Sequence, residues 1–205
     1  MQVKKASQRD LILRHAFRHF AKRGFKQTTM AQIAAAARMT VANIYVYFPS
    51  KMHLLYEIYR PMLTDQLERL AVEVRALATP EAKVRRLLAG IWCDLAVSHN
   101  GFANNLMQAL AEADPKQGKA DREFLTQCER FVSDLLRECL PADRRHLAGD
   151  ARVATFIWMA FDGFVINWRL GETRNSAGVA ELVADLILDH KLAAAQAPPG
   201  RAAAR

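Results

Sequence analysis

The chain has 205 residues, of which 51% are hydrophobic and 24% are charged, and its formal net charge at pH 7 is +8. So large an apolar share excludes a disordered chain, and no apolar run reaches the about 20 residues of a membrane span or forms the core of a signal peptide. The three cysteines are odd in number and widely spaced, which favours a cytoplasmic protein with no metal site and no cofactor.

The positive charge is concentrated in the first sixty residues. This segment contains eleven Lys and Arg against two acidic residues, whereas the rest of the chain contains 18 basic and 19 acidic residues. A local excess of this kind is typical of a surface that binds a polyanion. The alternative is a solvated face, which usually mixes both signs. We therefore expect nucleic acid, and not a membrane, as the partner of the N-terminal segment.

The first predicted helix begins after Ser7, which can cap it, with Asp10 in the acidic position of a capping box. Apolar pairs recur every four residues along it, so one stripe is expected to face a core. Gly24 is expected to end this helix.

Two short helices follow and are joined by a tight turn. Thr28 or Thr29 is expected to cap the first of them, and Thr40 the second, which Pro49 ends. Three or four residues around Arg38 form the turn. This arrangement predicts a helix-turn-helix, whose second helix enters the major groove of DNA.

A long helix is predicted from Lys51 to about Ala78. Pro61 lies inside it, so we expect a kink or break near Arg60. Further helices are predicted over residues 80–99, 103–113, 120–140, 151–170 and 179–191. The expected organisation is all-α, with a helix-turn-helix DNA-binding domain over residues 1–55, a larger helical domain over 56–193 and a disordered tail over 194–205.

Several residues between Ile12 and Tyr59 carry a resemblance to a known family. They are Ala16, Phe20, Gly24-Phe25, Thr28-Thr29, Ile33-Ala34, Ala37, Ile44-Tyr45-Val46-Tyr47-Phe48 and Ser50-Lys51-Met52-His53-Leu54. At these spacings the segment resembles the TetR family of one-component transcriptional regulators. The resemblance implies an all-α homodimer that binds a near-palindromic double-stranded operator, usually as a repressor released by a small molecule.

Two positions depart from the pattern of this family. Arg38 stands where the family usually has a turn glycine, and Ala42 stands where a glycine or similarly small residue is common. A turn glycine often serves a left-handed backbone, which costs another residue on the order of 1 kcal/mol. Either the turn differs slightly here, or Arg38 offsets this cost by contacting a DNA phosphate.

The resemblance places the base-reading residues at the start of the third helix. Asn43 suits bidentate pairing with adenine, and the methyl groups of Val41 and Ala42 suit thymine. Alternatively, Asn43 contacts phosphate or water, and Tyr45 is a core aromatic. Thr29, Tyr47 and Lys51 are expected at phosphates, and Lys4, Lys5 and Arg9 in a disordered basic arm that contacts the DNA backbone. The predicted DNA-binding residues are Thr29, Arg38, Thr40, Val41, Ala42, Asn43, Tyr45, Tyr47 and Lys51.

The last two predicted helices carry more apolar surface than one buried seam requires. In the resembled family the two final helices of each subunit form a four-helix dimer interface. The interface residues predicted on this basis are Phe156, Phe164, Trp168, Val179, Leu182, Val183 and Leu186. The alternative is a monomer in which both helices belong to the core.

An effector cavity is predicted between the helices of the larger domain. Its candidate residues are Trp92, His99, Phe102, Met107, Phe131, Trp158 and Phe161. Such a lining, with few interior charges, suits a hydrophobic or aromatic ligand. For each apolar residue an ordinary core position is the alternative, and His99 is either a polar anchor or a residue near a helix end.

The sequence gives little support for an enzyme. It contains no Gly-rich phosphate loop, no nucleophile elbow and no HExxH motif. The alternatives to a ligand-released repressor are a regulator without an effector, controlled by a partner protein or by its own abundance, and an activator.

Overall fold

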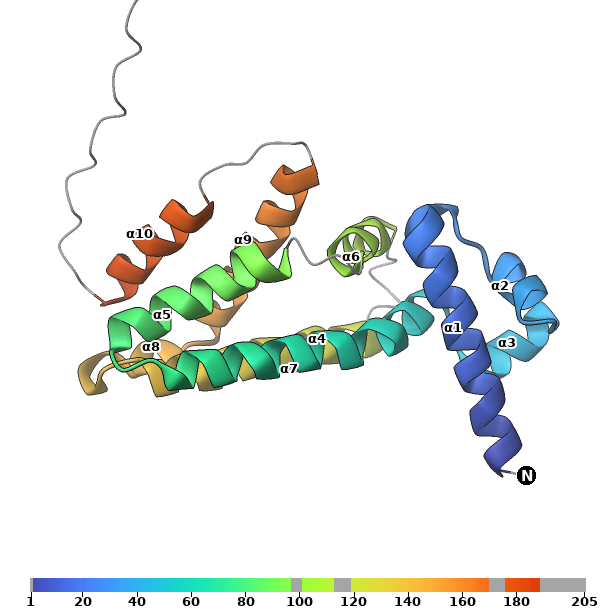
Figure 1. Cartoon of the computed structure of the whole chain (residues 1–205), viewed down its shortest axis with the longest axis horizontal. Coiled ribbons are helices and arrows are strands. Elements are labelled where there is room, and N and C mark those ends of the chain that lie inside the picture. Colours follow the sequence, from blue (N-terminus) through green and yellow to red (C-terminus); the bar gives the residue numbers. More distant parts are fainter. Residues whose placement is uncertain (1, 97–100, 113–118, 170–175, 189–205) are drawn as a thin grey trace, which may run out of the picture.

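The computed structural model describes residues 2–96, 101–112, 119–169 and 176–188. Within these ranges all regular secondary structure is helical, which confirms the all-α prediction. Three helices gather at one end of the molecule, namely α1 (Gln2–Gln27), α2 (Met30–Ala36) and α3 (Val41–Tyr47). The long α4 (Lys51–Ala76) leads from them into a larger helical body (Figure 1).

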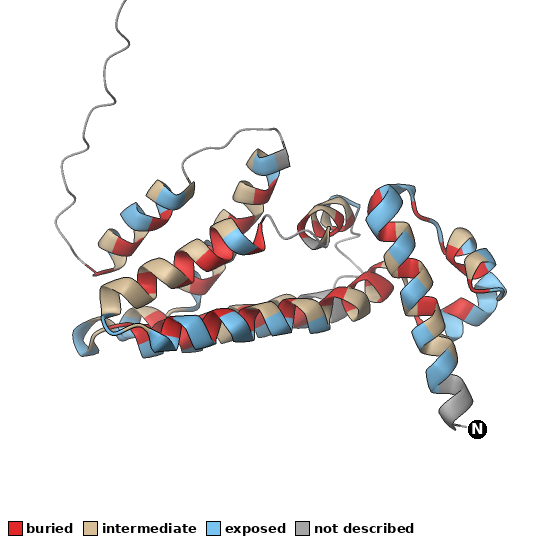
Figure 2. Cartoon of the chain, viewed as in Figure 1, coloured by how far each residue is buried: buried red, intermediate tan, exposed pale blue. Residues whose placement is uncertain are grey.

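The larger body is built around α4. Its further elements are α5 (Pro80–Ala89), the π-helical segment η1 (Gly90–Leu95), α6 (Phe102–Ala111), α7 (Lys119–Cys139), the 3-10 turn η2 (Ala142–Arg144), α8 (His146–Gly149), α9 (Ala151–Arg169) and α10 (Ser176–Leu188). α5 and α7 pack against α4, whereas α9 packs against α7, and α10 against α5. Buried residues line the helix faces that meet in this arrangement (Figure 2). Among the described residues, no helix is both long and apolar enough to cross a bilayer.

The short helices α2 and α3 are held in place by a core that they share with α1. Seven-residue helices are unstable in isolation, so their positions depend on buried side chains. Ile12 and Phe20 from α1, Ile33 from α2 and Ile44 from α3 are all at most 1% exposed. Phe48 is fully buried directly after α3. This small core fixes the orientation of α3 relative to α1.

The beginning of α1 differs from the prediction. The helix begins at Gln2, so the predicted start after Ser7, with Ser7 as its cap and Asp10 in a capping box, is wrong. The residues before Ser7 include good helix formers, which extend the helix past a local capping signal. Gly24 interrupts regular α1 at φ 77° and ψ 169°, as predicted, and a separate short turn continues to Gln27.

α4 also differs from the prediction. It runs without interruption from Lys51 to Ala76, so of the kink or break expected near Arg60 the break is wrong, and the kink stays a prediction. Tyr59, Leu63 and Leu67 are buried on both sides of Pro61, and tertiary contacts of this kind stabilise a helix that has lost one backbone hydrogen bond. The domain boundary at residues 55 and 56 falls within this helix and remains a prediction.

The sequence did not indicate two further features. η1 and α5 replace the first part of the single helix predicted over residues 80–99, because the α-helical pattern changes to a π-helical one at Gly90. η2 and α8 lie where no helix was predicted, and they are too short to produce a detectable apolar period. The predicted end of the earlier helix near residue 99 and the predicted tail lie outside the described residues.

The start of η1 lies very close to α4. A Cβ atom added to Gly90 would lie 2.3 Å from Cδ1, 2.7 Å from Cδ2 and 3.0 Å from Cγ of Leu70. Leu70 is itself buried, so its whole side chain would have to move. Any residue with a Cβ atom at position 90 would therefore force the Leu70 side chain to shift.

Replacing Gly90 with alanine is therefore expected to lower the free energy of unfolding by about 1–3 kcal/mol, as overpacking does in other cores. Urea unfolding followed by circular dichroism measures this change. Gly149→Ala is the matched control, because a Cβ there would meet nothing within 4 Å. Equal stability of the two variants would contradict the close approach.

Candidate functional site

The helix-turn-helix is fixed by two side-chain caps. The Thr29 hydroxyl accepts a hydrogen bond from the Gln32 backbone N–H at 3.2 Å, and the Gln32 side chain accepts one from the Thr29 N–H at 3.0 Å. The Thr40 hydroxyl accepts a hydrogen bond from the Asn43 N–H at 3.2 Å. Thr29 is thus the cap of α2 and Thr40 that of α3, as predicted. These caps define where each helix begins and which side chains face outward.

α3 is anchored on one face and open on the other. Ile44 is fully buried, whereas Val41, Ala42, Asn43 and Tyr45 are exposed. The side chain of Tyr45 is 49% exposed, so the alternative of a core aromatic at this position is wrong. The predicted base-reading residues therefore share the solvent-facing side of α3. Whether they contact bases stays a prediction.

Sequence reasoning missed one residue of this surface. Val46 is the most exposed large apolar residue of α3, at 69%. Thr29 and Thr40, at the starts of α2 and α3, are exposed as well. A valine gives no distinctive signal in a sequence, because in a helix the same residue type usually marks the buried face.

Two of the predicted phosphate contacts have partners within the chain. The Lys51 ammonium donates a hydrogen bond to the Phe25 carbonyl at 2.9 Å, lies 4.0 Å from the centroid of the Phe25 ring and lies 3.7 Å from the Glu112 carboxylate. The Tyr47 hydroxyl donates to the Gln8 side chain at 2.6 Å. Both side chains therefore brace the helix-turn-helix, and their DNA contacts stay predictions.

Arg9 has a comparable bracing role. Its guanidinium forms an ion pair with Glu57 of α4 and lies 5.3 Å from the centroid of the Phe48 ring. Arg9 is thus part of α1 and held against α4, so the predicted disordered arm is wrong: these residues are helical. The side chains of Lys4 and Lys5 lie outside the described residues.

Arg38 occupies the turn between α2 and α3 with a left-handed backbone, at φ 55°. Among the described residues it is the one non-glycine residue with positive φ. Its side chain is exposed beside the start of α3. The turn thus keeps the conformation that a glycine would favour, although an arginine stands there.

Arg38→Gly tests the role of this side chain. We expect a folded variant whose affinity falls for all DNA sequences alike, with a salt slope reduced by about one. Glycine removes the strain of a left-handed arginine, which stabilises the folded chain, but it also gives the unfolded chain more conformational freedom. The two effects oppose each other and are of similar size, so the free energy of unfolding should change little. Fluorescence anisotropy at several salt concentrations measures both quantities. Unchanged affinity and slope would contradict a phosphate contact.

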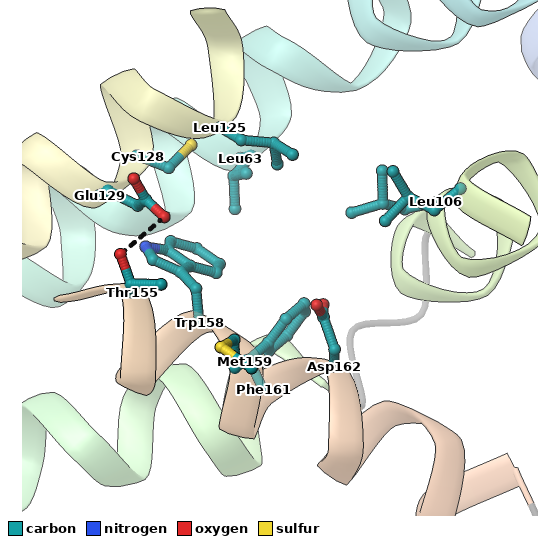
Figure 3. A pocket seen from close by; sticks show the side chains of 11 residues that line it. Leu63, Leu106, Leu125, Cys128, Glu129, Thr155, Trp158, Met159, Phe161 and Asp162 are labelled. Carbon is teal, nitrogen blue, oxygen red and sulfur yellow. Dashed lines mark hydrogen bonds between the residues drawn. The ribbon is translucent and has the colours of Figure 1, made fainter. Parts of the chain in front are cut away.

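A cavity of about 120 Å³ lies between four helices of the larger body (Figure 3). It is lined by Leu63 of α4, Leu106 and Leu110 of α6, Leu125, Cys128 and Glu129 of α7, and Thr155, Trp158, Met159, Phe161 and Asp162 of α9. Two predicted ligand residues, Trp158 and Phe161, lie in this lining. Their rings meet edge to face, with centroids 5.4 Å apart.

The other predicted ligand residues are placed differently. Trp92 is 1% exposed and donates its indole N–H to the Ile157 carbonyl at 2.8 Å, as a core residue. Met107 and Phe131 pack against the core and are not in the lining of this cavity. His99 and the side chain of Phe102 lie outside the described residues.

Polar groups in the cavity wall escaped the sequence analysis. Burial raises the pKa of Asp162 to about 6. The Glu129 carboxylate accepts a hydrogen bond from the Thr155 hydroxyl at 3.4 Å. The indole N–H of Trp158 is buried and has no hydrogen-bond partner among the described residues. Asp162 was visible in the sequence as an acid within an apolar helix, but its surroundings were not.

Asp162→Asn is expected to raise the melting temperature at pH 7.5, and this gain should shrink as the pH falls toward 4. The pKa of Asp162 rises from 3.8 to about 6 on folding, so between these values the native chain holds a proton that the unfolded chain has released. The stability that this proton provides is complete below pH 4 and is lost as the pH rises through 6. Asparagine cannot ionise.

Thermal unfolding of both proteins between pH 4 and 7.5 measures this difference. Glu123→Gln, which removes an exposed carboxylate from α7 outside the cavity, is the control. A gain of the same size at every pH would contradict a buried Asp162.

α6 lies between the cavity and the helix-turn-helix. Asn105 is 1% exposed and donates hydrogen bonds to the Gly101 carbonyl at 2.9 Å, the Tyr59 hydroxyl at 3.1 Å and the Phe20 carbonyl at 3.4 Å. The Gln108 side chain accepts a hydrogen bond from the Lys26 N–H at 3.0 Å. Leu106 and Leu110 of the same helix line the cavity. One helix therefore contacts both regions.

α9 and α10 expose many large apolar side chains. Exposed members of the predicted interface are Phe156, Trp168, Val179, Leu182 and Leu186, and Phe164 and Val183 are half-buried. Met159 and Ile166 of α9 are exposed as well and were not predicted. In α10 the spacing of Val179, Leu182 and Leu186 places them on one stripe.

No metal-binding group of three His, Cys, Asp or Glu residues occurs in the described parts of the chain.

The sequence model described as "Bacterial regulatory proteins, tetR family" matches residues 12–58. The HTH-type transcriptional regulator HbdR of Aromatoleum sp. (strain CIB) is 28% identical over 136 residues, which are 64% of this chain and 57% of HbdR. The HTH-type transcriptional repressor NicS of Pseudomonas putida (strain KT2440) is 35% identical over 98 residues, which are 48% of this chain and 46% of NicS. The matched region thus spans about half the length of these relatives.

Similar solved structures extend the likeness to the larger body. FadR of Thermus thermophilus, a TetR-family transcriptional repressor in complex with lauroyl-CoA, has a TM-score of 0.65 and 22% sequence identity. The likeness covers 94% of this chain and 100% of that chain. The predicted fold class, a helix-turn-helix followed by a larger helical domain, is thereby confirmed.

Proposed function

Because the chain belongs to the TetR family of bacterial regulatory proteins, we propose that it is a homodimeric repressor released from a near-palindromic operator by a small apolar ligand. Its relatives are named as transcriptional regulators, and the chain is accordingly a DNA-binding regulator and not an enzyme. The observation that carries the proposal is α3, which is anchored through Ile44 and exposes Val41, Ala42, Asn43 and Tyr45. The proposed site of action is the cytoplasm, where bacterial operators lie.

The excess of basic residues supports DNA as the partner. Eleven of the 29 Lys and Arg residues lie in the first sixty residues, which form α1, α2, α3 and the start of α4. Such a surface binds the phosphate backbone without regard to sequence. The exposed side of α3 would add the readout of base edges.

The stripe on α10 supports the dimer. A monomer rarely exposes a large contiguous apolar patch, whereas subunit interfaces regularly do. Val179, Leu182 and Leu186 lie together on α10, and α9 adds Phe156 and Trp168 to the exposed apolar side chains. Two copies joined through α9 and α10 would present two α3 helices to two half-sites about one DNA turn apart. The monomer remains the alternative.

The position of α6 supports a coupling between ligand and DNA. Movement of Leu106 or Leu110 by a ligand would shift Asn105 and Gln108, which hold the end of α1 through Phe20 and Lys26. A ligand can weaken operator binding by favouring a conformation in which the two α3 helices have the wrong spacing. The loss of operator affinity cannot exceed the ratio of the ligand's affinities for the two conformations.

The cavity supports a small effector. Its volume of about 120 Å³ is below the about 300–1,000 Å³ of drug-sized sites, so a small ligand, or a cavity that widens on binding, fits best. Thermus thermophilus FadR was solved with lauroyl-CoA. By analogy the apolar part of an acyl ligand is one candidate, and an aromatic compound is the other.

A thermal-shift screen of aromatic and other hydrophobic compounds tests the proposal, followed by anisotropy with operator DNA. The expected result is that compounds which raise the melting temperature also release the operator. Compounds that bind and leave DNA affinity unchanged would contradict the coupling. If no compound binds, the regulator without an effector is favoured. If bound ligand increases transcription only while the protein stays on its operator, the activator is favoured.

A further inference from the structure

The wall of the cavity combines an apolar surface with acidic groups and no basic one. Four of the eleven lining residues are leucines, and Trp158 and Phe161 contribute aromatic rings. Asp162 and Glu129 are the charged members of the lining, and neither Lys nor Arg is among them. Figure 3 shows the Asp162 side chain beside Phe161 on α9 and Glu129 across from it on α7. A site of this composition attracts a positive charge attached to an apolar body.

The Asp162 side chain is partly buried and has no counter-ion in the part of the chain that the structure describes. No ion pair or hydrogen bond joins its side chain to another described residue, and burial alone raises its pKa. The Arg60 guanidinium lies over the Phe124 ring, 5.1 Å from its centroid, and does not line the cavity. Burial raises the pKa of Cys128 to about 12, and the charge of Arg60 only partly opposes this rise. A buried carboxylate is unfavourable unless a cation pairs with it.

The indole of Trp158 contributes an aromatic ring and a polar group to the same wall. Its N–H is buried in the cavity wall and meets no acceptor among the described residues. Its ring and that of Phe161 also offer the faces and edges that bind organic cations. The aromatic rings and the Asp162 carboxyl therefore lie on the same helix, α9, at the wall of one cavity.

We propose that the cavity takes a ligand with an aromatic or short aliphatic body and a protonated amine, and that the Asp162 carboxylate is its counter-ion. This inference rests on the proposed function, because it concerns the same effector cavity. It distinguishes the effector from an anionic acyl compound, whose charge the two carboxylates would repel. The leucines and the two aromatic rings hold the body, and Asp162 selects the charged end.

The test compares compounds that share a body and differ in charge. The amines are 2-phenylethylamine and tryptamine, the neutral isosteres are 2-phenylethanol and tryptophol, and the anionic isosteres are 3-phenylpropanoate and indole-3-propanoate. Thermal shifts and calorimetric titrations of the full chain are expected to rank the amines first. Asp162→Asn should weaken amine binding about 10- to 100-fold and leave the neutral compounds unaffected. Glu123→Gln, with the same loss of charge outside the cavity, should bind amines as the unmodified chain does.

Asp162→Asn is expected to stabilise the empty protein, so a loss of amine binding cannot result from unfolding. The inference would be overturned if the anions bound best, if amine binding survived Asp162→Asn, or if no amine bound. Anions that bind and release operator DNA would refute the amine and leave the ligand-released repressor standing. Amines whose binding is lost in Asp162→Asn, but which do not change operator affinity, would support Asp162 as the counter-ion and refute release of the repressor by this ligand.

Discussion

Replacement of Leu182 and Leu186 with glutamate is expected to give a monomer that has lost about 10²- to 10⁴-fold in operator affinity. Both side chains lie exposed on the apolar stripe of α10, and Leu186 is 57% exposed. Four carboxylates would then face one another across the proposed two-fold interface, where like charges repel and lose their hydration. A monomer presents one α3 helix to one half-site, so binding of the second half-site by a partner subunit no longer increases the operator affinity.

Light scattering coupled to gel filtration measures the first effect against the chain mass of 23.0 kDa, and anisotropy with operator DNA measures the second. The double change to methionine is the matched control, because it keeps an apolar surface of similar volume and should preserve the dimer. A glutamate variant that stays dimeric, or an unmodified chain that is already monomeric, would contradict the interface on α9 and α10.

Asn43→Ala is expected to weaken operator binding about 10- to 100-fold and to relax selectivity at one base pair. The side chain of Asn43 is exposed on α3, while its backbone N–H is held by the Thr40 hydroxyl. Truncation therefore removes the amide without disturbing the start of the helix. An amide that pairs with adenine contributes to one base position and not to binding of random DNA.

Anisotropy with operator DNA, with operators changed at single positions and with random DNA separates these effects. Arg38→Gly is the contrasting variant, since a phosphate contact affects all sequences alike. An equal loss on operator and random DNA would show that Asn43 contacts phosphate or water, which is the alternative considered from the sequence.

The helix-turn-helix and the start of α4 were the most predictable parts of the chain, because their signals are local. Thr29, Thr40 and Ser50 each cap a helix through a residue three positions later, so a short window of sequence contains both partners. The left-handed turn at Arg38 was likewise indicated by a single departure from the family pattern. Such features need no knowledge of distant residues.

Other features depend on contacts between distant residues and could not be foreseen. α4 continues through Pro61 because the side chains around it are buried by other helices. The π-helical segment begins where Gly90 meets Leu70. Lys51 pairs with the Phe25 carbonyl and with Glu112, neither of which is near it in the sequence.

The cavity shows the same limit. Its eleven lining residues come from four helices, and its aromatic members resemble core residues such as Trp92 in every sequence property. Helical periodicity identifies the buried face of each helix, but it does not show where the buried faces leave a space. Asp162 acquires its raised pKa from that assembled environment.

Selection of binding sites from random double-stranded DNA tests the central claim most directly, followed by anisotropy at physiological salt with the selected site and with random DNA. Our account predicts a near-palindromic site that the unmodified chain binds at least about 10³-fold more tightly than random DNA, and a preference at one base pair that disappears with Asn43→Ala. Equal affinity for all sequences would contradict it, and would leave the basic surface as a nonspecific DNA-binding surface.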